Sequence, residues 1–194
     1  MKKYKWVLAS ASPRRKEILS SLIKDFEIRV SDADESYKSA LPSEIVKEIA
    51  GNKGRAVLKN AAEGEIVIAA DTLVFAGNRI LGKPSGADEA YEMISLISGK
   101  EHHVATGVFV GVKEAGNEIT DCFSEISSVY VDELSDEEIK AYISTDEPYD
   151  KAGGYAIQGL FGRFIRKIDG DYYNIVGFPL NAFYRFCKMK GYIL

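Results

Sequence analysis

A short segment near the amino terminus combines residue types that suit phosphate binding. Residues 10–15 follow an apolar run, and Ser12 has the character of a helix N-cap with a proline directly after it. Unpaired backbone N–H groups and the positive end of the helix dipole would therefore face this segment. Ser10 adds a hydroxyl, and Arg14 and Arg15 add forked guanidinium groups matched to phosphate oxygens. The alternative is a capped surface helix with a solvated basic first turn, although cations there oppose the dipole.

Two carboxylates stand where they could hold a cation or move a proton. Asp71 directly follows the apolar run 66–70, and ligands of α/β sheets bind outside the carboxyl ends of strands. An aspartate there can bind a divalent ion or accept a proton from water, or it can simply cap the next turn. Glu35 lies in an acidic loop with Asp32 and Asp34. Such oxygens suit Mg²⁺ or Mn²⁺, although most acidic loops are only solvated.

Isolated lysines and one glutamine complete the set of candidates. Lys53 and Lys83 lie beside glycines, where a fixed ammonium group can reach a phosphate, although lone lysines are more often surface charge. Gln158 lies in the segment 145–159, which is rich in glycine, charge and aromatic rings. Its amide can pair with the alternating C=O and N–H edge of uracil or thymine, and the alternative is a structured loop. The adjacent His102 and His103 would point to opposite sides of a strand, so we interpret both as structural.

Hydrophobic periodicity and turn residues predict the elements that carry these side chains. The predicted strands cover residues 4–9, 26–30, 66–70 (ending at Asp71-Thr72), 104–112 and 119–131. The predicted helices cover residues 13–23, 43–58 (capped by Ser43 and weakened by Gly51 and Gly54), 87–97, a stretch opened by residues 135–138, and 179–190. Tight turns are expected at 77–78, 82–84 and 116–117, and residues 146–166 lack a clean period. Alternating strands and helices with one hairpin indicate an α/β fold with a mixed β-sheet flanked by helices.

The bulk properties favour a single soluble domain over residues 1–194. Apolar residues make up 46% of the chain and charged residues 28%, and the net charge of −4 argues against a general nucleic-acid binder. Cys122 and Cys187 have no metal-ligand or redox spacing, which is typical of idle thiols in a reducing compartment. The basic start Met1-Lys2-Lys3 imitates a secretory signal, but its apolar part is too short, and no stretch suits a membrane span. We expect a cytoplasmic protein without nucleic-acid or membrane partners.

Seven segments in order resemble the Maf family of nucleoside triphosphate pyrophosphatases over almost the whole chain. The matching segments are residues 10–15, Asp34-Glu35-Ser36, Lys53, residues 70–74, Gly82-Lys83-Pro84, Thr106-Gly107-Val108 and residues 147–159. The resemblance implies an α/β fold with two lobes around a cleft, similar to the inosine triphosphate pyrophosphatases, and a homodimer. It also implies hydrolysis of a nucleoside triphosphate to the monophosphate and pyrophosphate, with a divalent cation, Mg²⁺ or Mn²⁺, required.

The resemblance also implies roles for individual residues. Asp71 matches the catalytic proton acceptor and Glu35 its acidic partner, and both are expected to hold the metal. The positions that line the phosphates match Ser10, Arg14, Arg15, Lys53 and Lys83. The family usually has Lys-Ala where this chain has Lys53-Gly54, so the glycine is expected to loosen the helix around Lys53.

Three residues bear on the choice of nucleotide. Arg14, Thr72 and Gln158 look like the set of the branch that hydrolyses dTTP and UTP, whereas the branch that acts on 7-methyl-GTP typically carries glutamate in place of Gln158. The first hypothesis is therefore a dTTP/UTP pyrophosphatase that removes surplus or modified pyrimidine nucleotides. The alternatives are a pyrophosphatase for 7-methyl-GTP or other modified nucleotides, and a nucleotide-binding regulator of septum formation.

Overall fold

The computed structural model describes residues 4–193. The basic start of the signal-like segment, residues 1–3, lies outside the described residues. Within them, no helix combines the length and the apolar character that crossing a membrane requires.

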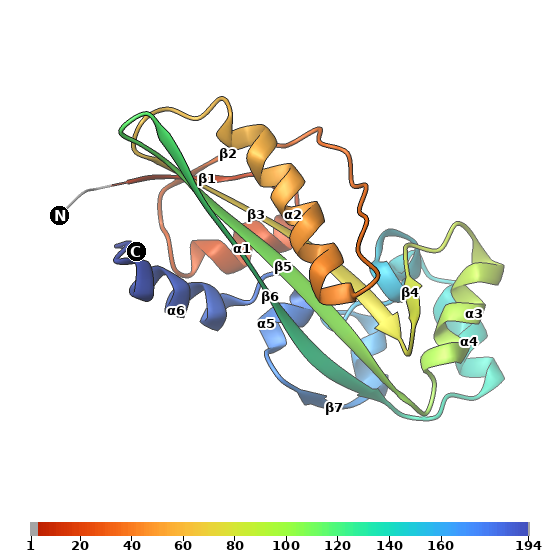
Figure 1. The fold of residues 1–194 in the computed structure, drawn as a ribbon. Coiled ribbons are helices and arrows are strands. Elements are labelled where there is room, and N and C mark those ends of the chain that lie inside the picture. Colours follow the sequence, from red (N-terminus) through yellow and green to blue (C-terminus); the bar gives the residue numbers. More distant parts are fainter. Residues whose placement is uncertain (1–3, 194) are drawn as a thin grey trace. The chain divides into compact units, whose positions relative to one another are not determined.

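A seven-stranded sheet forms the centre of the fold (Figure 1). Its strands are β1 (Lys5–Leu8), β2 (Phe26–Ile28), β3 (Glu65–Ala76), β4 (Arg79–Leu81), β5 (Glu101–Glu114), β6 (Asn117–Val131) and β7 (Ile165–Asp169). The order is β2-β1-β3-β5-β6-β7, and β4 pairs with β3 outside this path. Strand β1 runs parallel to β2 and β3, whereas the pairs β3–β4 and β6–β7 are antiparallel. The predicted mixed sheet is confirmed.

Helices flank the sheet. Short 3₁₀ turns form much of the segment 146–166, which lacks a sequence period. The helices are α1 (Pro13–Ser20), α2 (Pro42–Leu58), α3 (Ala87–Ile97), α4 (Asp136–Ile143), α5 (Tyr172–Val176) and α6 (Leu180–Lys190). The 3₁₀ turns are η1 (Glu147–Asp150), η2 (Ala152–Gly154) and η3 (Leu160–Phe164). Helix α3 has the predicted limits, and Ser135 caps α4 with a reciprocal capping box to Glu138.

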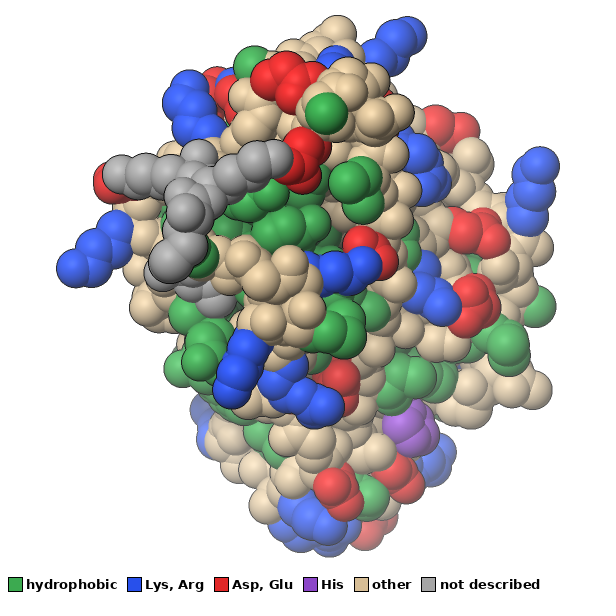
Figure 2. Space-filling model, turned by 60° about the vertical axis from the view of Figure 1, so that its left-hand side comes forward, with side chains coloured by type: hydrophobic (Ala, Val, Ile, Leu, Met, Phe, Trp, Pro, Cys, Tyr) green, Lys and Arg blue, Asp and Glu red, His purple; other side chains and the backbone are tan. Residues whose placement is uncertain are grey.

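The chain divides into two compact units, each with its own core. Unit 1 comprises the chain up to Asp71, Thr106–Glu125 and the chain from Gly177, and unit 2 comprises Thr72–Ala105 and Ile126–Val176. One core lies in unit 1 and consists of Val7, Ala9, Ala50, Val57, Leu58, Ala61, Val67, Ala69 and Phe109. The core of unit 2 gathers aliphatic residues of α3 and α4 around the rings of Tyr142, Tyr155, Phe161 and Phe164. Figure 2 shows Lys and Arg side chains interspersed with Asp and Glu over the visible face.

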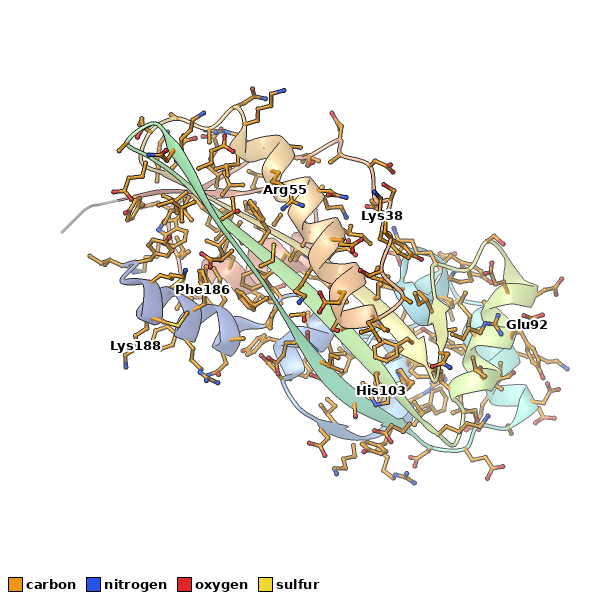
Figure 3. All side chains as sticks on the ribbon, viewed as in Figure 1. Lys38, Arg55, Glu92, His103, Phe186 and Lys188 are labelled. Carbon is orange, nitrogen blue, oxygen red and sulfur yellow. The ribbon has the colours of Figure 1, made fainter. Side chains whose placement is uncertain are left out.

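The prediction that Gly54 weakens the second helix is wrong. Helix α2 runs unbroken through Gly51 and Gly54, because Gly54 packs directly on a ring of β5. A Cβ atom at Gly54 would lie 1.9 Å from Cδ1 of Phe109, so the glycine admits close packing of helix on sheet. Arg55, labelled in Figure 3, follows in the same turn with its guanidinium 5.9 Å from the centre of the Phe109 ring.

Two predicted element boundaries also differ from the structure. Leu41, not Ser43, is the N-cap of α2, because Pro42 with its preset φ occupies the first helical turn. Strand β3 does not end at Asp71 but continues to Ala76, because its last residues pair with β4 across the turn at Gly77, where φ is +56°.

Smaller differences concern the ends of α1 and the connection after β4. Helix α1 ends at Ser20, three residues before the predicted Ile23, because Ser21 donates from both its N–H and its hydroxyl to the Ile18 carbonyl. Residues 82–84 form an irregular connection rather than a tight turn. The short elements β4, β7 and α5 were not predicted.

Candidate functional site

The phosphate-binding candidates lie on the connection between β1 and α1 in unit 1. Ser12 is the N-cap of α1, and its hydroxyl accepts a hydrogen bond from the Arg15 N–H at 3.4 Å. The Ser10 hydroxyl accepts from the Ser12 N–H and from Nη1 of Arg15, both at 3.3 Å. The predicted cap is therefore confirmed, and the loop is held in a conformation that gathers N–H and hydroxyl groups at a helix N-terminus. Such a group of donors favours an anion.

Arg15 is fixed by the protein, whereas Arg14 is a half-exposed neighbour in the same helix turn. Nε of Arg15 donates to the Gly177 carbonyl at 3.0 Å. Burial lowers the pKa of Arg15 from its ordinary value, and the charges of Asp71 and Glu35 raise it in opposition. The guanidinium therefore shares one electrostatic environment with both candidate carboxylates.

Lys53 joins the two candidate carboxylates of unit 1. Its Nζ lies 2.7 Å from Oδ1 of Asp71 and 2.7 Å from Oε1 of Glu35. The side chains of Lys53 and Asp71 are 15% and 13% exposed, whereas that of Glu35 is 68% exposed. The cluster therefore has a buried side formed by α2 and β3 and an open side formed by the acidic loop.

Close packing of α2 on the sheet brings Lys53 to Asp71. Gly54 touches the Phe109 ring, and a Cβ atom at Gly107 of β5 would lie 2.3 Å from the Val46 carbonyl oxygen. With no side chain at either glycine, the helix approaches the sheet closely on both sides of Lys53. Gly54 therefore does not loosen the helix around Lys53, contrary to the prediction from the sequence.

The remaining candidates lie in unit 2. Thr72 is half-buried on β3, directly after Asp71, and Lys83 is exposed on the connection between β4 and α3. Gln158 is exposed between η2 and η3. The N–H of Gly153 donates to the Gly82 carbonyl at 2.9 Å, so the segment leading to Gln158 is tied to the connection that carries Lys83.

Other groups in unit 2 are structural or were not assigned a role from the sequence. His102 is buried and shares a hydrogen bond of 2.6 Å with the Tyr155 hydroxyl, whereas His103, labelled in Figure 3, stacks on Phe75. Glu147 accepts hydrogen bonds from two backbone N–H groups of η3, a contact that no sequence period reveals. The three glycines nearby were the available signal, because they indicate close approach.

A shallow hollow of about 490 Å³ in unit 2 is not part of this chemistry. It is lined by Tyr91, Lys100, Glu133 and Asp136 among others, and none of the candidate residues contributes to it.

A search of solved structures finds a protein of the same fold. The structure of the Staphylococcus aureus Ham1 protein superposes with a TM-score of 0.53 over 96% of this chain and 99% of that chain, at 13% identity. The predicted fold class, a mixed sheet flanked by helices, is thereby confirmed.

The chain belongs to the Maf family. The family model described as Maf-like protein matches residues 5–189. Its relatives include proteins named dTTP/UTP pyrophosphatase. That of Lachnoclostridium phytofermentans is 46% identical over 97% of this chain and 96% of the relative. That of Alkaliphilus oremlandii is 51% identical over 90% of each chain. That of Thermococcus gammatolerans is 49% identical over 97% of this chain and 98% of the relative.

Proposed function

We propose that this protein hydrolyses dTTP and UTP to the monophosphate and pyrophosphate. The observation that carries the proposal is the contact of Lys53 with both Asp71 and Glu35 beside the donors of the β1–α1 connection. It supplies a proton acceptor and a set of cationic and N–H donors, which hydrolysis of a phosphoric anhydride requires. The names of relatives at 46–51% identity support the choice of dTTP and UTP.

In this proposal each side chain acts on a stated part of the reaction. Asp71 accepts a proton from the water that attacks the anhydride between the α- and β-phosphates, and pyrophosphate leaves. Ser10, Arg15 and the N-terminus of α1 bind phosphate oxygens, and Arg14, Lys53 and Lys83 add positive charge. Gln158 reads the imide edge of the pyrimidine, with Arg14 and Thr72 contributing to the choice of base.

We further propose that Glu35 and Asp71 hold a divalent cation, Mg²⁺ or Mn²⁺. Their oxygens converge on one ammonium nitrogen at 2.7 Å each, so the two carboxylates are close enough to share a cation. One or two carboxylates together with substrate phosphates are the usual ligands of Mg²⁺. When bound there, such an ion would supply positive charge against the phosphates. Titration with Mn²⁺ followed by electron paramagnetic resonance should show weaker binding to Glu35→Gln than to the wild type. Equal binding would contradict this assignment.

The substrate is tested with a panel of nucleotides. Purified protein is supplied with Mg²⁺ or Mn²⁺, and pyrophosphate release is measured from dTTP, UTP, CTP, GTP, ATP and 7-methyl-GTP. We expect dTTP and UTP to have the highest kcat/KM. Turnover of 7-methyl-GTP that equals or exceeds that of UTP would overturn the assignment to pyrimidines.

The proposal extends to assembly and location. We propose a homodimer, in line with the family resemblance, and a cytoplasmic enzyme, in line with the free thiols of Cys122 and Cys187. Light scattering coupled to size exclusion tests the first, since a single 21.4 kDa species would contradict it. Fractionation of cells that express a tagged chain tests the second.

A further inference from the structure

The carboxylate of Glu147 holds the backbone that follows Gln158. Its Oε2 accepts the N–H of Leu160 at 2.7 Å, and its Oε1 accepts the N–H of Phe161 at 3.1 Å. These two N–H groups open η3 and, as the first of a helical turn, have no carbonyl of that turn to bind. A carboxylate that bridges two such groups makes charge-assisted hydrogen bonds, which are about twice as strong as neutral ones.

Gly159 makes this contact possible. A Cβ atom at Gly159 would lie 2.3 Å from Oε2 of Glu147, and the three nearest atoms all belong to that carboxylate. The backbone of Gly159 is extended, with φ −152° and ψ −160°, so any residue could adopt it. A side chain at this position would therefore meet the Glu147 carboxylate and displace it from its contact with η3.

The carboxylate of Glu147 also contacts a buried residue of the unit 2 core, Tyr142. The hydroxyl of Tyr142 lies 3.1 Å from Oε1 of Glu147 and 3.2 Å from the Gly154 carbonyl, and these two acceptors share its single hydrogen. Tyr142 is a residue of α4 and is 1% exposed. Tyr142 of α4 thus holds the carboxylate of Glu147 in place. That carboxylate in turn holds the backbone of η3.

Gln158 lies between two anchored stretches of chain. On its amino-terminal side Tyr155 is buried and bound to His102, and on its carboxyl-terminal side the N–H groups of η3 are bound to Glu147. The side chain of Gln158 itself is exposed. An exposed amide between two fixed points is presented to solvent with little backbone freedom. Such preorganisation lowers the entropy cost of binding a ligand.

We propose that Glu147 is a positioning residue, which sets the orientation of Gln158 toward the nucleobase through Gly159 and the first N–H groups of η3. The inference rests on the proposed function of Gln158 as the reader of the pyrimidine edge. Loosening the contact weakens recognition of the base and leaves the proton transfer at Asp71 intact. The KM for UTP therefore rises while kcat stays nearly constant.

The test is a cycle of variants at the two contacting residues. Steady-state kinetics with UTP are measured for Glu147→Ala, Gly159→Ala and the double variant. We expect each single change to raise KM about tenfold with kcat within about threefold. In the double variant the added methyl group no longer meets a carboxylate, so Gly159→Ala adds less than about twofold to the effect of Glu147→Ala. Glu147→Asp tests rescue, since a shorter carboxylate should restore part of the loss.

Two controls separate positioning from general damage. Glu137→Ala removes an exposed carboxylate of α4 in the same unit and should leave KM and Tm unchanged. If Glu147→Ala lowers kcat and Tm together and leaves KM unchanged, Glu147 has a merely structural role. Full additivity of the two single changes would also overturn the proposal. A wild-type protein that turns over some other nucleotide refutes the substrate assignment alone, and the cycle is then measured with that nucleotide.

Discussion

The cluster of Lys53, Asp71 and Glu35 in unit 1 and the Gln158 segment of unit 2 are held in place by different means. Lys53 and Asp71 project from a long helix and a long strand, which glycines bring into close contact. Gln158 projects from non-repetitive chain whose backbone is bound by one carboxylate, that of Glu147.

The difference bears on how each region tolerates change. A helix and a strand that pack closely together hold their charged side chains in narrowly defined positions. A proton transfer requires such precise placement. A segment fixed by side-chain hydrogen bonds can be altered at one residue without disturbing the sheet. The comparison therefore predicts that changes in unit 1 affect chemistry or stability, and that changes near Gln158 affect the choice of substrate.

The largest expected effect is at Asp71. Asp71→Asn keeps the shape of the side chain but removes the proposed proton acceptor and the negative charge that pairs with Lys53. We expect kcat for UTP to fall on the order of 10³-fold, within the range for loss of a general base. The Kd for UTP, measured by calorimetry, should change only a few-fold. If the wild type binds UTP and never hydrolyses it, the protein is a nucleotide-binding regulator, and the residues of unit 1 hold a ligand without carrying out a reaction.

The packing of α2 on the sheet is tested at Gly54. Gly54→Ala forces a methyl group into the ring of Phe109, so we expect the free energy of unfolding in urea to fall by about 1–3 kcal/mol. Gly51→Ala in the same helix is the matched control. There the new methyl group meets only the flexible guanidinium of Arg55, and helix propensity favours alanine by up to about 1 kcal/mol. Equal effects at both positions would show that close approach to β5 is unimportant.

Much of the fold was predictable because its signals are local. The cap at Ser12, the limits of α3 and the capping box of α4 all follow from residues within one or two helical turns. The continuation of β3 past Asp71 was missed, because it depends on pairing with β4, a strand of three residues without a recognisable period. The effect of Gly54 was also misjudged, because it depends on Phe109, which lies far away in the sequence.

The contacts of the candidate site likewise fall into local ones, which the sequence predicts, and long-range ones, which it does not. Ser12 and Arg15 are neighbours in one helix turn, so their hydrogen bond follows from the sequence. The contact of Lys53 with Asp71 joins a helix to a strand, and only the packed structure brings them to 2.7 Å. The contact of Glu147 with η3 was hidden for another reason, since its partners are backbone N–H groups and carry no residue signature.

A smaller effect, on specificity rather than rate, is expected at Gln158. Gln158→Glu replaces a neutral amide by a carboxylate, which meets the carbonyl oxygens of uracil with repulsion. We expect kcat/KM for UTP to fall about 10- to 100-fold, and the ratio of 7-methyl-GTP to UTP turnover to rise. The free energy of unfolding should stay within about 0.5 kcal/mol of the wild type, because the side chain is exposed. A uniform loss with all nucleotides would contradict a role in base selection.

The smallest expected effect distinguishes the two units by their response to acid. In unit 2, burial lowers the pKa of His102 from 6.5 to about 4. The folded protein therefore disfavours the protonated ring, and the stability that this residue supports is present above pH 6.5 and is lost as the pH falls toward about 4. In unit 1, hydrogen bonds from Arg29 at 2.6 and 2.8 Å lower the pKa of Glu65 from 4.5 to about 2. The stability supported by this carboxylate is present above pH 4.5 and is lost as the pH falls toward about 2.

Urea unfolding at pH 7, 4.5 and 3 measures both losses, each on the order of 1–2 kcal/mol. Between pH 7 and 4.5 the wild type should lose stability that His102→Gln does not lose. Between pH 4.5 and 3 the loss should be smaller in Glu65→Gln than in the wild type. If Glu65→Gln instead reduced the loss of unfolding free energy between pH 7 and 4.5, the assignment of one acid-sensitive residue to each unit would be wrong. The two regions would then differ in how they hold their side chains but not in what destabilises them.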